Sequence, residues 1–394
     1  MLTATGRTTT SINVVSIGID YTPAYEQGGG IGRYVRELVQ ALALQDSQTD
    51  YRLFVAGAEA AQLPASPADN FHWTPTRLPT MWLARIWHRA RLPYPVERFT
   101  GDLGIFHATD FVLPPTYPST KTILTVHDLS FVRTPETAAP RLRRYLNRVV
   151  PRSIARADHV LADSAATKRD IIDLYGTFPE KITVLLSGVN RGRFSPVEDK
   201  WTLLATQRKY GIDPDTPYVF SIGTVQPRKN YSMLVRAVAK LRARDICVNL
   251  VIAGGRGWLE DDFYQTIERL NAHNYVRMIG FADDDDLAAL YSAAACTAFV
   301  SLYEGFGFPV LESMACGTPV VTSNVSSLPE VAGDVAPIVD PYEIDQTVSV
   351  LQQVLSDGGY AKKLRQRGLG HVHNFTWERA ALNLRAVYRQ ILEA

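Results

Sequence analysis

Short runs of apolar, mostly β-branched residues alternate along the chain with longer segments whose apolar positions recur at helical spacing. Helix-period segments such as 31–44 and 165–175 separate several of these runs. Near-continuous apolar strands separated by helices are typical of a parallel sheet covered on both faces. The predicted strands are 12–20, 51–57, 103–110, 121–128, 159–164 and 181–188, followed by 218–223, 247–255, 275–280, 296–301, 319–323 and 335–340.

The strand and helix rhythm stops at the polar segment 187–200 and then restarts, which makes this segment the predicted linker. A chain of 394 residues exceeds the size of one ordinary core, so two domains of roughly 150–200 residues are expected. We predict an α/β fold with two Rossmann-like, doubly wound domains, residues 1–190 and 191–374, that face a central cleft. Ligands in such sheets bind beyond the carboxyl ends of the strands, so the loops after strands are the places to look for a site.

Composition leaves this picture unchanged, because 46% hydrophobic and 21% charged residues are ordinary values for a globular protein. No apolar run approaches the roughly 18 residues of a membrane span, and the first twenty residues have too short an apolar core for a secretory signal. We therefore expect a cytoplasmic protein. Cys247, Cys296 and Cys316 lie in apolar surroundings without CxxC spacing, which predicts buried, reduced thiols.

Charge is unevenly distributed, although the net charge is only +1. Residues 1–195 hold 22 basic and 17 acidic side chains, a balance of +5, and the remaining 19 and 23 give −4. Basic residues gather with aromatic ones in 81–99, and more follow in 141–152. Two interpretations stay open: a surface that meets anionic lipid at the inner face of the cell membrane or an anionic acceptor, and two ordinary solvated helix faces. No nucleic-acid partner is expected.

The segment "YEGFGFPVLE" carries the strongest chemical signal. Pro309 suits the first turn of a helix, so Gly305-Phe306-Gly307 is predicted to be a strand-to-helix loop with accessible amides. A helix start adds partial positive charge, which favours a phosphate group. Glu312, about one turn into the helix, is placed to bind vicinal hydroxyls such as those of ribose, and Glu304 to reach the group beyond the phosphates. The alternative is that both carboxylates only complement the helix N-terminus.

Two more loops follow predicted strands. In "GTVQPRKN", Arg228 and Lys229 precede a helix, and a guanidinium with an ammonium suits a diphosphate leaving group. In "ILTVHD", His127 ends a strand, where it can contact a sugar hydroxyl or serve as a structural histidine.

Two other motifs are weaker. The glycines of "GGGIGRYVREL" allow a backbone to approach an anion, but Arg33 breaks the dinucleotide fingerprint. "FADDDDL" has carboxylates that Mg²⁺ could use, yet four aspartates before a helix are better interpreted as an N-cap. No metal site is predicted.

Taken together, "GGGIGRY", "VHDLSF", "LSGVNRGRF", "GTVQPRKN", "VIAGG", "IGFADDDDL" and "YEGFGFPVLESMACGTPVV" resemble the retaining glycosyltransferases of family 4, with most similarity to bacterial mannosyltransferases of surface polysaccharides. The resemblance runs from about Gly28 to 375–381. It implies the GT-B fold, in which two Rossmann-like domains face each other. The C-terminal domain of that fold holds a sugar nucleotide, the N-terminal domain offers the acceptor surface, and the last helix, here about 375–394, packs back on the first domain.

Carried onto this sequence, the resemblance gives each motif a role. It implies a catalytic pair, a set of donor contacts and no required metal or other cofactor. One departure is Thr224, because many family members have arginine at that position. The implied catalytic residues are His127 and Glu304, and the implied donor contacts are Gly29, Gly30, Arg228, Lys229, Phe306, Gly307 and the ribose-binding Glu312.

The function expected from this resemblance is transfer of a hexose, mannose from GDP-mannose, to a glycan or lipid-linked acceptor with retention of anomeric configuration. An enzyme of the same fold that uses a UDP-sugar is the nearest rival. A nucleotide-dependent oxidoreductase would share the α/β rhythm, but the missing GxGxxG argues against it. A silent sugar-nucleotide-binding protein is a third alternative, against which the retained charged residues count.

Overall fold

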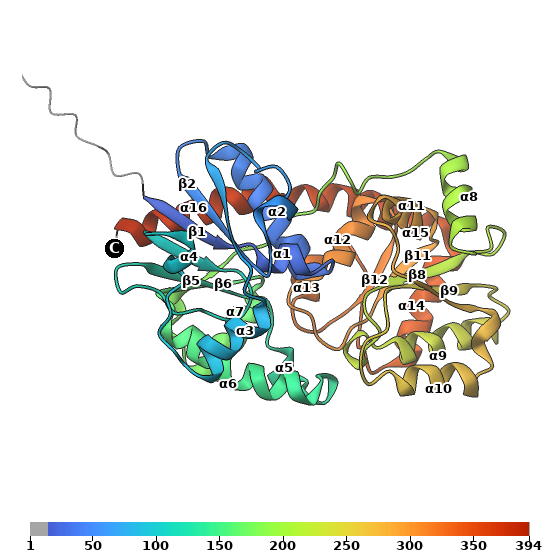
Figure 1. Cartoon of the computed structure of the whole chain (residues 1–394). Helices are drawn as coiled ribbons and strands as arrows, with labels where there is room; N and C mark the ends of the chain where they lie inside the picture. Colours follow the sequence, from blue (N-terminus) through green and yellow to red (C-terminus); the bar gives the residue numbers. More distant parts are fainter. Residues whose placement is uncertain (1–14, 394) are drawn as a thin grey trace, which may run out of the picture.

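The computed structural model describes residues 15–393, which form two α/β units side by side (Figure 1). One sheet has seven strands in the order β3-β2-β1-β4-β5-β6-β7, and the other has six in the order β10-β9-β8-β11-β12-β13. All strand pairs are parallel. The prediction of two doubly wound parallel sheets is thus confirmed.

Each predicted strand has a counterpart in the sheets, although residues 12–14 of the first one lie outside the described residues. The first sheet consists of β1 Ser16–Asp20, β2 Asp50–Ala56, β3 Phe71–Thr76, β4 Ile105–Ala108, β5 Lys121–Val126, β6 His159–Ala162 and β7 Ile182–Val184. The second consists of β8 Tyr218–Ile222, β9 Asn249–Ala253, β10 Val276–Gly280, β11 Cys296–Phe299, β12 Val320–Ser323 and β13 Ile338–Val339.

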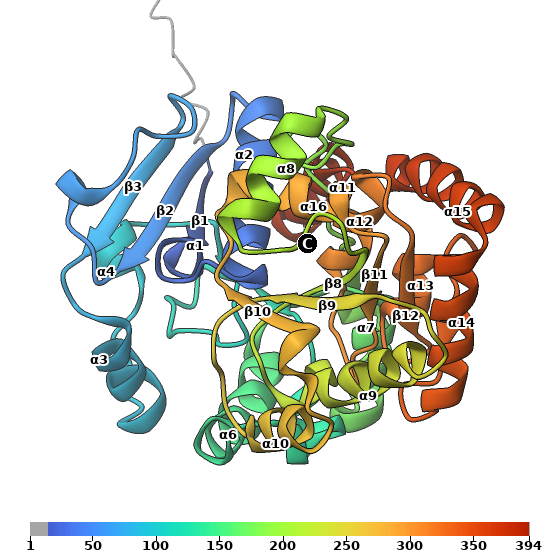
Figure 2. The same ribbon diagram turned by 90° about the vertical axis from the view of Figure 1, so that its right-hand side faces the viewer.

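Strand β3 was not predicted. It pairs with β2 and forms the outer edge of the first sheet (Figure 2). Its sequence FHWTPT is largely polar and contains Pro75, and only Phe71 is buried. Proline is tolerated on an edge strand because one side of that strand needs no backbone hydrogen bonds. The strand therefore lacks the continuous apolar pattern by which the others were recognised.

Helices cover both faces of each sheet. In the second unit, Val219, Leu250 and Ile252 point into one core, while the neighbouring Phe220 and Val251 point into the other. The long helices are α2 Gly30–Gln45, α6 Pro140–Arg156, α7 Ala165–Tyr175, α8 Lys200–Lys209, α9 Tyr231–Arg242, α10 Asp261–Arg269, α14 Ile344–Ser356, α15 Gly358–His371 and α16 Trp377–Glu393. The shorter ones are α1 Thr22–Glu26, α3 Thr80–Ala84, α4 Glu97–Thr100, α5 Ser130–Arg133, α11 Leu287–Ala293, α12 Phe308–Ala315 and α13 Leu328–Ala332.

Helix α16 belongs to the end of the chain but packs on the first sheet's side of the molecule (Figure 1). Leu384 and Tyr388 join the core formed by β1, β2 and α2. The Tyr388 hydroxyl lies 2.8 Å from Nδ1 of His107, and Arg385 Nε donates to Asp46 Oδ2 at 3.0 Å. The chain thus crosses between the units twice, while the domain boundary at residue 190 stays a prediction.

Both sheets reverse their strand order next to the first strand of the unit, between β1 and β4 and between β8 and β11. The loops at such a switch point diverge, and the space between them is where doubly wound folds bind ligands. This topology brings the loops after β1, β4, β8 and β11 to the region between the two units.

Two local predictions were only partly correct. Cys247 is exposed, because it precedes β9 instead of lying within it, whereas Cys296 and Cys316 are buried as expected. The aspartates of "FADDDDL" precede α11 as expected, with Asp286 as its N-cap residue, but Asp284–Asp286 form a 3₁₀ turn and no side chain makes a cap hydrogen bond. Asp283 and Asp286 instead accept from Lys209 Nζ at 2.6 and 2.5 Å.

Candidate active site

A cavity of about 370 Å³ lies between the two units. Glycines from the start of α2 and His127 line it from the first unit, and Glu304 and Arg228 line it from the second. All nine residues that the sequence analysis nominated line this one cavity, which they reach from four separate loops and helix starts. Their hydrogen-bond and ion-pair partners limit the role that each residue can have.

The loop before α12 is held by its neighbours. The Glu304 amide donates to Ser326 Oγ at 2.8 Å, and Ser327 Oγ donates to the carbonyl oxygens of Glu304 and Phe306 at 3.0 and 2.7 Å. Phe306 is only 4% exposed, and its ring contacts those of Phe308 and Phe375. Phe306 can therefore offer a ligand only its backbone.

The glycines of this loop serve different purposes. Gly307 has a φ of +117° and forms the N-cap of α12, a conformation that L side chains rarely adopt. A Cβ on Gly305 would lie 2.1 Å from the His127 carbonyl oxygen. Gly305 is thus required for close packing of the two units, a role that the sequence did not predict, and it also lines the cavity.

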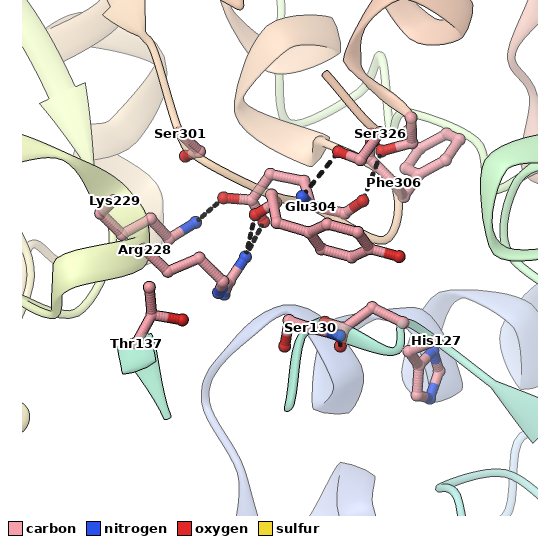
Figure 3. A network of polar contacts seen from close by, with 12 residues as sticks. His127, Ser130, Thr137, Arg228, Lys229, Ser301, Glu304, Phe306 and Ser326 are labelled. Carbon is pink, nitrogen blue, oxygen red and sulfur yellow. Dashed lines mark hydrogen bonds and ion pairs between the residues drawn. The ribbon is translucent and has the colours of Figure 1, made fainter. Parts of the chain in front are cut away.

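Glu304 lies between two cations (Figure 3). Its Oε2 is 2.6 Å from Arg228 Nη1, and its Oε1 accepts from Lys229 Nζ at 2.7 Å. Burial alone would raise the pKa of Glu304, but Arg228 and Lys229 lower it to about 2. Burial lowers the pKa of Lys229, and Glu304 opposes that lowering. With two basic side chains and one carboxylate, the cluster has an excess of formal positive charge at the start of α12. Such a cluster can bind an anion.

His127 directly follows β5, on the opposite side of the cavity (Figure 3). It is 5% exposed, with Nδ1 at 2.7 Å from Asp163 Oδ2 and Nε2 at 2.8 Å from the Thr109 carbonyl oxygen. Burial would lower the pKa of His127, but the Asp163 carboxylate outweighs burial and raises it to about 9. The ring is thus an imidazolium that donates from both nitrogens, with both donors already used by protein oxygens.

Glu312 is 2% exposed, and both of its oxygens have partners. Oε2 accepts from the Tyr291 hydroxyl at 2.8 Å, and Oε1 pairs with Arg33 Nη1. Arg33 comes from α2 of the first unit and also reaches Asp284, at 3.2 Å. The Glu312 carboxylate, which was expected to bind ribose, is therefore already paired with an arginine from the facing unit.

Gly29 is the N-cap of α2, and Gly30 is its first residue. A Cβ on Gly28 or Gly29 would meet no atom within 4 Å, and one on Gly30 would only touch Phe308 at 3.7 Å. By contrast, a Cβ on Gly32 would lie 2.0 Å from the Gln27 carbonyl oxygen. The first glycines thus leave space in the cavity instead of relieving a contact within the protein.

Sequence reasoning missed Arg33 and Asp163 as members of this site. In the sequence, Arg33 was noted only as the residue that breaks a dinucleotide motif. Its partner Glu312 lies 279 positions away in the chain. Asp163 directly follows β6 and lies next to His127, and the order of parallel strands would have placed the two at one edge of the sheet. A prediction of strand order could have found Asp163, whereas no local pattern points to the partner of Arg33.

Two family models match the chain in tandem. One described as Glycosyltransferase Family 4 matches residues 28–193, and one described as Glycosyl transferases group 1 matches residues 205–370. O-antigen chain mannosyltransferase B of Escherichia coli is 33% identical over 362 residues, which cover 89% of this chain and 93% of that protein. The chain belongs to glycosyltransferase family 4.

Other relatives of this glycosyltransferase have different names and activities. A D-inositol 3-phosphate glycosyltransferase of Salinispora arenicola is 32% identical over 285 residues, which cover 68% of this chain and 63% of that protein. Among solved structures, sucrose-phosphate synthase from Thermosynechococcus elongatus has a TM-score of 0.74 at 21% identity, covering 96% of this chain and 99% of that one. Anabaena Alr3699/HepE in complex with UDP-glucose has a TM-score of 0.69 at 17% identity, covering 95% and 99%. At these identities the structures show the shared GT-B fold alone.

Family membership makes this protein a glycosyltransferase enzyme and replaces the oxidoreductase alternative. Within residues 15–393, no group of three or more histidine, cysteine or acidic side chains is arranged to hold a metal ion. No helix in that range combines the length and apolar character of a membrane span.

Proposed function

We propose that this glycosyltransferase moves mannose from GDP-mannose to a glycan or lipid-linked acceptor with retention of anomeric configuration. The observation that carries the proposal is the Arg228, Lys229 and Glu304 cluster at the start of α12, which lies in the cavity between the domains. The 33% identical mannosyltransferase of E. coli supports mannose as the sugar. A UDP-sugar is the second candidate, since the related fold of HepE holds UDP-glucose.

The proposed reaction uses the charges of the cavity. The acceptor hydroxyl oxygen bonds to C1 of the donor sugar while the bond from C1 to the diphosphate oxygen breaks, and the hydroxyl proton passes to that diphosphate. Arg228, Lys229 and the amides before α12 stabilise the negative charge that develops on the leaving group. These groups supply the positive charge, so the proposal includes no metal ion and no other cofactor.

The roles of the two glutamates and of His127 follow from their contacts. Glu304 orients the two cations and accepts hydrogen bonds from hydroxyls of the donor sugar. Glu312 binds the ribose diol once Arg33 moves off Oε1. The proposed catalytic role of His127 requires Nε2 to exchange the Thr109 carbonyl for an oxygen of the substrate.

Isothermal titration calorimetry with GDP, UDP, ADP and NAD, each with and without EDTA, tests this proposal. We expect GDP to bind most tightly and EDTA to change nothing. Preference for UDP would retain the family and change the donor, and failure of all nucleoside diphosphates to bind would refute the site. With GDP-mannose and an acceptor, the anomeric proton and carbon signals of the product in NMR decide between retention and inversion.

A peripheral location at the cytoplasmic face of an anionic membrane is part of the same proposal. Met81, Trp82 and Leu92 are 58, 50 and 54% exposed, and the Arg85 guanidinium lies 4.7 Å from the Trp82 ring centroid. An adjoining groove is lined by Arg91, Arg152 and Arg156. Exposed apolar side chains beside arginines suit an anionic lipid surface and a lipid-linked acceptor.

Sedimentation with lipid vesicles tests this location. Wild-type protein should sediment with vesicles containing phosphatidylglycerol, and replacement of Arg85, Arg89 and Arg91 by glutamine should abolish sedimentation. Vesicles of phosphatidylcholine serve as the control. Equal sedimentation of the variant would favour ordinary solvated helix faces.

A further inference from the structure

A second cavity, of about 170 Å³, lies in the first domain beside the one already described. Helix α1, the α3 segment, the loop after β4 and helix α6 contribute to its walls. Three carboxylates and four aromatic rings dominate the lining. The acids are Asp20, Glu26 and Asp110, and the rings are Phe54, Trp87, His88 and Tyr145.

The two cavities share a wall. Gln27 lines the second cavity and donates from Nε2 to Asp110 Oδ2 at 3.3 Å, while the next residues, Gly28 and Gly29, line the first. On the other side of Asp110, the Thr109 carbonyl accepts from His127 of the first cavity. The contact between Gln27 and Asp110 thus lies on the side of the second cavity that faces the first.

The carboxylates have hydrogen-bonding capacity that the protein does not use. Asp20 Oδ1 accepts from the Thr22 amide at 3.0 Å, and Glu26 Oε1 accepts from Thr80 Oγ1 at 2.6 Å. Asp20 accepts hydrogen bonds only from Thr22, and within residues 15–393 no protein donor reaches Glu26 Oε2 or Asp110 Oδ1. Acceptor oxygens that face a cavity suit a ligand rich in hydroxyl donors.

Charge narrows the ligand class further. No lysine or arginine is among the residues that line this cavity, in contrast to Arg33, Arg228 and Lys229 in the first. Burial lowers the pKa of His88 to about 4, so its ring is neutral near pH 7. Burial also raises the pKa of Asp20 to about 6 and raises that of Asp110. A phosphate would meet acids and no cation, whereas an uncharged polyol would meet acceptors and ring faces.

We propose that this cavity, which we call the acidic-aromatic cavity, is the acceptor subsite and holds one uncharged pyranose ring, the terminal sugar of the acceptor. The proposal rests on the proposed function, because it assigns the acceptor of the same transfer. The three acids accept hydrogen bonds from ring hydroxyls, and Trp87 or Tyr145 covers an apolar face of the sugar. One hydroxyl then lies toward the Gln27 and Asp110 contact and attacks the donor. Its proton still passes to the departing diphosphate, so the acids only bind and orient.

Saturation-transfer NMR and calorimetry with methyl α-glycosides of mannose, glucose, galactose and N-acetylglucosamine, in the presence of saturating GDP, test the assignment. We expect at least one glycoside to bind, and Asp20→Asn and Asp110→Asn each to weaken its binding about tenfold or more, while Asp102→Asn leaves it unchanged. Asp102 is the matched control because it is an exposed aspartate of the same domain. Thermal unfolding of each variant checks that the fold is intact.

Reciprocal measurements separate this inference from the proposed function. Lys229→Ala should weaken GDP binding and leave glycoside binding intact, because Lys229 lines only the first cavity. Normal GDP binding without binding of any glycoside, or with binding that neither aspartate variant weakens, would overturn the acceptor subsite alone. Failure of GDP to bind, with glycoside binding that Asp20→Asn abolishes, would refute the donor proposal and support the sugar site.

Discussion

The two domains present different chemistry to the cleft from equivalent places, the carboxyl ends of their parallel strands. The second domain places Arg228 and Lys229 after β8 and the start of α12 after β11. The first places Asp20 at the end of β1, Asp110 after β4 and His127 after β5. One side is suited to an anionic leaving group, and the other to an uncharged hydroxyl-bearing ligand.

This difference shows how little of the specificity belongs to the fold. Both domains have the same kind of sheet and the same strand reversal, so topology determines only where a ligand binds. Which ligand binds depends on a few loop residues and on how the protein stabilises them. Glu304 raises the pKa of Arg228 and opposes the burial that lowers the pKa of Lys229, whereas Asp20 is held in a buried position that raises its pKa.

The largest effect is expected at the carboxylate between the cations. Glu304→Gln should lower kcat by at least about 100-fold, because the transition state loses an oriented charge network. GDP should bind equally well or more tightly, since Arg228 and Lys229 lose an anion that competes with the diphosphate. Steady-state kinetics and calorimetry measure both quantities, with the exposed Glu343→Gln as the control. Unchanged turnover would remove Glu304 from catalysis.

In the first domain, His127 should make the stability of the protein depend on pH. Its pKa of about 9 in the folded protein exceeds the ordinary 6.5, so the folded state binds the proton more tightly than the unfolded state. The resulting stabilisation, up to about 3 kcal/mol, is fully present below pH 6.5 and is lost as the pH rises to about 9. Urea unfolding at pH 6, 7.5 and 9 should therefore show the advantage of wild type over His127→Gln shrinking. A difference independent of pH would mean that His127 is uncharged.

Substitution of Lys229 tests directly whether the second domain binds an anionic donor. Lys229→Ala should weaken GDP binding by about 1.5–3 kcal/mol, the scale of a charged hydrogen bond. Calorimetry measures this change, and Lys362→Ala, at an exposed lysine of the same domain, should leave the affinity unchanged. Equal affinities of the two variants would exclude the cation pair as the diphosphate site.

The smallest expected effect concerns the contact that joins the two sides. Arg33→Ala should tighten GDP binding about tenfold, because the ribose no longer has to displace an arginine from Glu312. Comparison of GDP with 2′-deoxy-GDP in calorimetry isolates the ribose contribution, and the gain should be smaller for the deoxynucleotide. Weaker binding of GDP to the variant would show instead that Arg33 itself contacts the donor.

Much of the fold could be predicted from the sequence because buried parallel strands carry a local signal. Runs such as Lys121–Val126 and Tyr218–Ile222 are apolar, β-branched and separated by helical patterns. Strand β3 was not predicted, because an edge strand is half solvated and this one includes Pro75. The partner of the aspartates before α11 could not be predicted for a different reason, since Lys209 lies 74 or more positions away.

The sequence by itself determined the two parallel sheets, the family and the loops that line the donor cavity, because each depends on residues close together in the chain. Only the tertiary structure decided that Arg33 pairs with Glu312, that Asp163 raises the pKa of His127, and that Gly305 packs closely against the other domain. It also assembled the acidic-aromatic cavity from α1, α3, α6 and the loop after β4. The physical reason is that ion pairing, burial and steric contact depend on distances in space, and these contacts join residues far apart in the sequence.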